Sequence, residues 1–171
     1  MFLEEIRVIE TTPCLAEKHL FKAVTLASVS LDGILPYLNA VVDRPNYQPS
    51  SNSLVFKDGG IEFTLKDYNI NVAKFSNMTH LYELLDWIKN LINDVHESRD
   101  EIEPSHKARK IVPVFKIHGL LPKTNCGECG EASCMAFAAK LNKFDAEIEG
   151  CPPLLSPEHR ELREKLTEVM E

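Results

Sequence analysis

The chain has 171 residues, of which 44% are apolar and 26% are charged, and its formal net charge is −7. This composition excludes a disordered or collagen-like chain, and the length suits one large domain or two small ones. The acidic balance argues against a nucleic-acid-binding protein. The odd number of cysteines, five, argues against a simple disulfide framework.

Five segments in the first 75 residues are predicted to be β-strands. They combine apolar and β-branched residues and end at turn residues: residues 5–10, 19–28, 54–56, 61–65 and 70–75. The segment 19–28 also fits a buried helix, although Val24, Thr25 and Val29 favour a strand. Asp58-Gly59-Gly60 is typical of a hairpin turn because glycine readily adopts positive φ. The last three segments therefore predict an antiparallel meander.

The clearest helix of the sequence covers residues 78–97. Its apolar side chains recur at the spacing of one helix face: Leu81, Leu84, Leu85, Ile88, Leu91, Ile92 and Val95. We expect this stripe to cover one face of the meander, with Trp87 at the edge of the core. A partner-binding face is the alternative. A shorter helix is predicted over residues 34–42, and a loop over residues 43–53.

The second half of the chain begins with a charge-dense segment, residues 97–110, which contains Pro104 and predicts a linker. Beyond it, an alanine-rich helix is predicted over residues 131–143. A last helix is predicted to start at Ser156, a good N-cap, with a proline following it. The sequence thus predicts an α+β protein with two domains. Residues 1–103 form an antiparallel sheet packed with helices, and residues 104–171 form a mainly helical domain.

Neither an export signal nor a membrane span is indicated. The first residues lack the basic and apolar regions of a secretory signal. The least charged window, residues 23–42, holds Asp32 and Pro36, which oppose a membrane span. We therefore expect a cytoplasmic protein, in which clustered thiols are more often metal ligands than disulfides.

Four of the five cysteines follow the spacing C-x2-C-x4-C-x16-C-P: Cys126, Cys129, Cys134 and Cys151. The first two can reach one metal centre together, while Gly127 and Gly130 let backbone N–H groups point at sulfur. Cys134 is expected in the first turn of the alanine-rich helix, whose N-terminal dipole favours negative charge.

Four thiolates can hold either a zinc ion or an iron–sulfur cluster. Structural zinc usually comes with two C-x2-C pairs, and only one is present, so the spacing favours iron–sulfur. A catalytic C-x-x-C dithiol would leave Cys134 and Cys151 unexplained. Four buried structural cysteines would not explain the interleaved glycines.

Residues 118–153 resemble a small four-cysteine [4Fe–4S] domain. The run from Leu121-Pro122-Lys123-Thr124-Asn125 to Cys134, followed by Cys151-Pro152, is similar to that domain in the large subunit of the corrinoid iron–sulfur protein and in the B subunit of Rnf-type electron-transport complexes. The resemblance implies one [4Fe–4S] cluster with these ligands: Cys126, Cys129, Cys134 and Cys151. The chain has no room for a corrinoid-binding barrel. It also resembles short stand-alone iron–sulfur proteins of anaerobic microbes.

The leading functional hypothesis is single-electron transfer without substrate chemistry, because four thiolates leave no open iron site. The resemblance implies a redox partner such as a corrinoid protein or its reductase, and residues 1–103 are expected to dock it. A redox sensor or adaptor and a structural zinc module are the alternatives. Cys14, far from the motif, is expected to be a bystander thiol. His118 lies near the motif, but four cysteines already complete a cluster.

Overall fold

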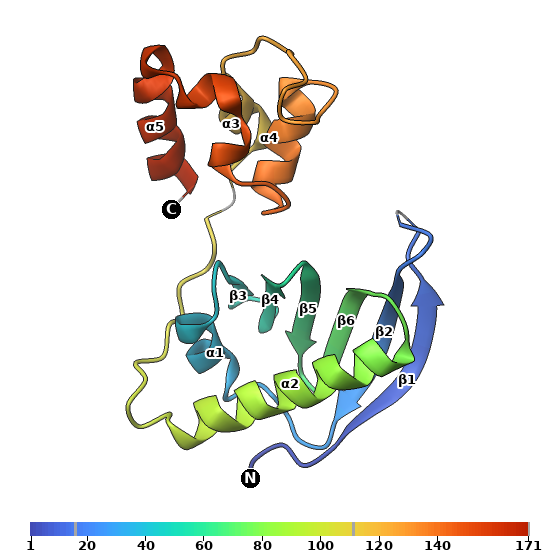
Figure 1. Ribbon diagram of the computed structural model, residues 1–171. Helices are drawn as coiled ribbons and strands as arrows, with labels where there is room; N and C mark the ends of the chain where they lie inside the picture. Colours follow the sequence, from blue (N-terminus) through green and yellow to red (C-terminus); the bar gives the residue numbers. More distant parts are fainter. Residues whose placement is uncertain (16, 111, 171) are drawn as a thin grey trace. The chain divides into compact units, whose positions relative to one another are not determined.

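The computed structural model describes residues 1–15, 17–110 and 112–170, so residues 16, 111 and 171 of the predicted domains lie outside the description. The chain forms two compact units, Met1–Arg109 and Lys110–Glu171 (Figure 1). A six-stranded antiparallel sheet and helices build the first unit, and helices build the second. The predicted α+β fold is confirmed.

The sheet of the first unit has the strand order β1-β2-β6-β5-β4-β3, and every adjacent pair is antiparallel. Its strands are β1 Ile6–Pro13, β2 Phe21–Ala27, β3 Asn46–Gln48, β4 Ser53–Asp58, β5 Ile61–Lys66 and β6 Asn69–Phe75. The segment 19–28 is therefore a strand, and the meander is confirmed as β4, β5 and β6. The predicted loop over residues 43–53 is wrong at β3, a strand too short to show alternation.

Helix α2, Met78–Glu97, has the predicted limits and lies across one face of the sheet (Figure 1). It begins after Asn77, whose side-chain oxygen accepts a hydrogen bond from the His80 N–H at 3.0 Å. The predicted stripe packs into the core, with its most buried members at Leu81, Leu85, Ile88, Ile92 and Val95. Trp87 lies at the core edge, as predicted, 5.2 Å from the ring of Phe63.

The end of the predicted linker is bound to the first unit. Helix α1, Leu35–Val41, carries the buried Asn39, whose amide donates hydrogen bonds to the carbonyl oxygens of Ser105 at 2.7 Å and Lys107 at 3.2 Å. The Arg109 N–H donates to the Tyr47 carbonyl in β3 at 3.3 Å. The units accordingly divide after Arg109, whereas the sequence places the division after residue 103.

The described residues of the second unit form three α-helices: α3 Val114–Gly119, α4 Cys134–Asn142 and α5 Arg160–Met170. Helix α4 begins three residues later than predicted, because Ser133 is its N-cap and accepts from the Ala136 N–H at 3.2 Å. The last helix is preceded by a 3-10 turn, Pro157–His159, directly after Ser156. No helix in the described part of the chain is both long and apolar enough to cross a membrane.

Candidate metal centre

The loop from Cys126 to Gly130 presents the first two cysteines of the motif. Cys126 is exposed and Cys129 is half-buried. Gly127 and Gly130 have φ angles of 76° and 80°, a region that glycine adopts without a steric penalty. The Gly130 N–H donates to the Gly127 carbonyl at 2.9 Å and closes the turn. The glycines therefore allow a tight loop that carries both thiols.

Cys134 is the first residue of α4 and is 7% exposed. Its N–H donates to the side-chain oxygen of Asn125 at 2.8 Å, and the Asn125 N–H lies 3.4 Å from the Cys134 sulfur. These two contacts join the start of the helix to the residue before Cys126. The predicted placement of Cys134 in the first turn of the helix is confirmed.

Cys151 lies between two 3-10 turns, Ile148–Gly150 and Pro152–Leu155, and is 5% exposed. The following segment is fixed by hydrogen bonds. The Leu154 N–H donates to the Cys151 carbonyl at 3.0 Å, and Nδ1 of His159 lies 2.9 Å from the Pro153 carbonyl. The last cysteine of the motif therefore sits in an ordered, buried turn.

The last thiol of the motif, that of Cys151, has a raised pKa. Burial raises the pKa of the Cys151 thiol, and the thiols of Cys129, Cys134 and Cys126 raise it further, whereas a backbone hydrogen bond from Leu154 acts in the opposite direction. A set of four thiols suits an iron–sulfur cluster or zinc. Within the described ranges, no three His, Cys, Asp or Glu side chains are grouped as they would be around a single metal ion.

Cys14 and His118 are the two other candidate residues that the sequence indicates. Cys14 follows β1 in the first unit, is half-buried, and donates its N–H to the Leu20 carbonyl at 2.7 Å. His118 lies in the last turn of α3 in the second unit. The sequence pattern alone does not mark Asn125 as part of the site. The signal that could have found it is an asparagine directly before a cysteine-containing turn, because asparagine tolerates left-handed backbone.

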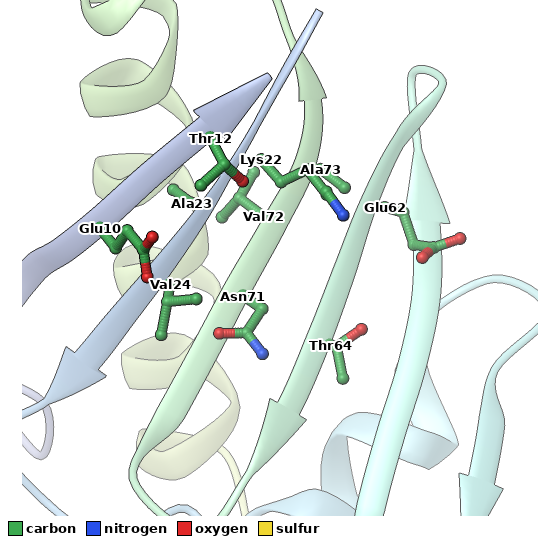
Figure 2. A pocket seen from close by; sticks show the side chains of 10 residues that line it. All are labelled: Glu10, Thr12, Lys22, Ala23, Val24, Glu62, Thr64, Asn71, Val72 and Ala73. Atoms are coloured by element: carbon green, nitrogen blue, oxygen red, sulfur yellow. The ribbon is translucent and has the colours of Figure 1, made fainter. Parts of the chain in front are cut away.

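A separate hollow of about 280 Å³ lies on the sheet of the first unit (Figure 2). Apart from the core residues Ala23 and Val72, the side chains that line it alternate along the strands with those of the core. Strand register places Lys22 and Glu62 on either side of Ala73. Among the described residues, the side-chain oxygen of Asn71 is buried without a hydrogen-bond partner. None of the described residues that line the hollow is a cysteine, so it is a different site from the candidate metal centre.

Comparison with known proteins supports an iron–sulfur domain in the second unit. Residues 121–153 match the family model described as "Putative Fe-S cluster". The acetyl-CoA decarbonylase/synthase complex subunit gamma of Methanothermobacter thermautotrophicus is 47% identical over 55 residues, which are 32% of this chain and 12% of the relative. The subunit of the same name from Methanocaldococcus jannaschii is 44% identical over 61 residues, 36% of this chain and 12% of the relative.

The corresponding gamma subunit of Methanosarcina acetivorans is 45% identical over 60 residues, 35% of this chain. The chain spans 12% of the length of each of these three curated relatives. No solved structure matches the chain. The similarity therefore concerns an iron–sulfur domain. It does not extend to most of the length of these relatives, and so it does not cover their activity.

Proposed function

We propose that the chain is an iron–sulfur protein that binds one [4Fe–4S] cluster and transfers single electrons to a partner protein. The proposed ligands are Cys126, Cys129, Cys134 and Cys151. The observation that carries the proposal is that four cysteines with the spacing C-x2-C-x4-C-x16-C all lie inside residues 121–153, which match the iron–sulfur family model. A cluster bound to four thiolates supplies one-electron redox chemistry and leaves no iron open to a substrate.

The proposed cluster would have one side buried in the protein and one side exposed to solvent. Cys134 and Cys151 are buried in the core of the second unit, next to Phe137 and Leu154, which exclude water. Cys126 is exposed and is followed by the small Gly127. A partner can therefore approach most closely at the Cys126 side, and this side is the proposed place of electron exchange.

The proposed partner is a redox protein of anaerobic metabolism. The relatives are named as gamma subunits of acetyl-CoA decarbonylase/synthase complexes. These names support an association of this chain with a larger protein complex. The resemblance of the motif to corrinoid-linked proteins makes a corrinoid protein or its reductase our specific proposal. The first unit, with its own sheet and core, is the proposed docking part.

The decisive experiment is anaerobic purification of the full chain followed by metal and sulfide analysis. We expect about four irons and four sulfides per chain, with broad absorbance near 400 nm that dithionite bleaches reversibly. One zinc without iron would identify a structural zinc module and overturn the proposal. A cluster that decomposes on reduction would contradict electron transfer and favour a sensor or adaptor.

The partner is tested by an anaerobic pull-down with the loaded chain, followed by mixing the reduced protein with a purified corrinoid protein or its reductase. We expect reoxidation of the cluster by the partner on mixing. Reoxidation by neither protein would contradict the proposed partner class.

A further inference from the structure

We propose that Asn125 is a positioning residue that fixes the Cys126 loop against the start of α4, and so sets the relative placement of two proposed ligands. The inference rests on the proposed cluster site. Asn125 makes two contacts with the same residue, Cys134, which is nine positions away in the sequence. Its side-chain oxygen accepts the Cys134 N–H at 2.8 Å, and its own N–H lies 3.4 Å from the Cys134 sulfur.

The first contact satisfies one of the backbone donors that every helix leaves free at its start. Helix α4 already has its N-cap, because Ser133 accepts the Ala136 N–H at 3.2 Å. Asn125 therefore accepts from a different donor, the N–H of Cys134 at the first helical position. Asn125 itself lies outside the helix. This contact ties a separate segment of chain to the helix start, in addition to the N-cap.

The second contact points a backbone N–H at the Cys134 sulfur. Hydrogen bonds of this kind stabilise anionic sulfur and raise the reduction potential of a cluster. The side-chain contact to Cys134 fixes the backbone that directs this N–H at the sulfur. A change of the side chain should therefore alter both the retention of iron and the potential.

The backbone of Asn125 also explains why this position suits asparagine. Its φ is 48°, in the left-handed region that asparagine and glycine adopt more easily than most residues. Glycine would keep this conformation and lose the acceptor oxygen. Aspartate would keep an acceptor and add a negative charge. Alanine would lose the acceptor and also strain the backbone, so the three substitutions separate conformation from hydrogen bonding.

The test compares Asn125→Gly, Asn125→Asp and Asn125→Ala in the full chain, purified anaerobically, with three measurements: iron per chain, the rate of iron release to a chelator, and the reduction potential. We expect Asn125→Gly to release iron roughly tenfold faster, the factor that corresponds to the loss of one typical hydrogen bond. Asn125→Asp should restore slow release but lower the potential, because its carboxylate lies beside an anionic cluster. Asn125→Ala should be the fastest of the three.

The control is Asn52→Gly, because Asn52 also has a left-handed backbone, with φ 43°, but lies in the first unit. It should leave iron release and potential unchanged. If the wild type holds iron and Asn125→Gly releases iron at the same rate as the wild type, this inference is overturned while the proposed function stands. Equal release from the Gly and Asp variants would overturn it too, because the acceptor would then not matter. A wild type without iron would overturn the proposed function, and the inference with it.

A further measurement reads the contact separately from iron release. Amide exchange in the anaerobically purified, cluster-loaded chain should show the Cys134 N–H protected in the wild type and in Asn125→Asp, and unprotected in Asn125→Gly. Protection at the Ile117 N–H, which donates to the Pro113 carbonyl at 3.3 Å, reports whether the unit remains folded. An unprotected Cys134 N–H in a folded wild type would contradict the proposed tie.

Discussion

The hydrophobic cores of the two units differ in the side chains that they bury. The first unit buries aliphatic and aromatic side chains between the sheet and α2, among them Phe63, Leu65 and Ile88. The core described for the second unit includes Cys134 and Cys151, and other residues pack around them. Small domains often lack enough apolar surface for stability and then use a metal or disulfides. The first unit therefore has a core of aliphatic and aromatic side chains, whereas the core of the second unit includes two of the proposed cluster ligands.

The largest expected effect follows from removing a buried proposed ligand. Cys151→Ser should abolish the cluster, and much of the stability of the second unit should go with it, because metal-binding free energy acts as folding free energy in small metal domains. We expect iron below one per chain and loss of amide protection in α4, with protection in α2 unchanged. The measurements are iron analysis and hydrogen exchange.

Cys14→Ser is the matched control for this comparison, because Cys14 lies in the first unit. It should keep the full iron content. Iron loss from this control would overturn the ligand assignment. Persistent protection of α4 in Cys151→Ser would show that the core of the second unit is stable without the cluster, and the proposed difference between the units would be wrong.

The reverse experiment damages the first unit. Phe63 is fully buried and stacks on Phe56 with ring centroids 5.3 Å apart. Phe63→Ala should lower the unfolding free energy of the first unit by about 3–5 kcal/mol, the usual cost of removing a buried aromatic ring. Chemical denaturation followed through the fluorescence of Trp87, which contacts Phe63, measures this loss.

The iron content of Phe63→Ala should stay at the wild-type level, because the second unit has its own core. Phe115→Ala is the control, since the side chain of Phe115 is 73% exposed and its removal should change little. Parallel loss of iron and of the first unit in Phe63→Ala would show that the two units fold as one.

A smaller effect is expected where the first unit anchors its N-terminal segment. The side-chain oxygen of Asn93 accepts the N–H groups of Phe2 and Leu3 at 2.9 and 2.8 Å, and its amide donates to the Leu3 carbonyl at 3.0 Å. Asn93→Ala should cost about 2 kcal/mol, because it leaves buried backbone groups without partners. Thermal unfolding and amide exchange at Leu3 check this, with the exposed Asn90→Ala as control. Retained protection at Leu3 would contradict the anchor.

The sequence predicts best those features whose cause is local and periodic. The limits of α2 follow from its apolar stripe and from Asn77 before it, and the placement of Cys134 follows from the helix signal after the motif. Other features depend on contacts between distant residues, which periodicity does not encode. The segment up to Arg109 is held to β3 by such a contact, the Arg109–Tyr47 hydrogen bond.

The site shows the same division between local and distant causes. The spacing of the cysteines and glycines predicts a loop with two thiols, and the structure has that loop. The tie between Asn125 and Cys134 spans nine residues and depends on a left-handed backbone, so no repeat or spacing rule indicates it. The ligand set itself stays a prediction until the metal is measured.

The smallest expected effect concerns pH and again separates the two units. Burial, then Arg99 and the N-terminal amine, lower the pKa of His96 below its usual 6.5, while Glu97 acts in the opposite direction. His96 also stacks on Phe2, with ring centroids 4.2 Å apart. The folded state therefore binds fewer protons here than the unfolded chain, so the stability that this histidine contributes is present above its ordinary pKa and is lost as the pH falls from 6.5 through the lower pKa of the folded state.

We expect a small decrease in the melting temperature of the first unit on acidification through this range, and a shallower decrease in His96→Phe, which keeps an aromatic ring beside Phe2. Thermal unfolding of both proteins at several pH values measures the two slopes. Equal slopes would exclude His96 as a source of the pH dependence. Since α2 carries His96 and the motif cysteines lie in the other unit, the loss on acidification should appear in the fluorescence of Trp87 and leave the protection of α4 unchanged. An equal loss in α4 would show that the two units are energetically coupled.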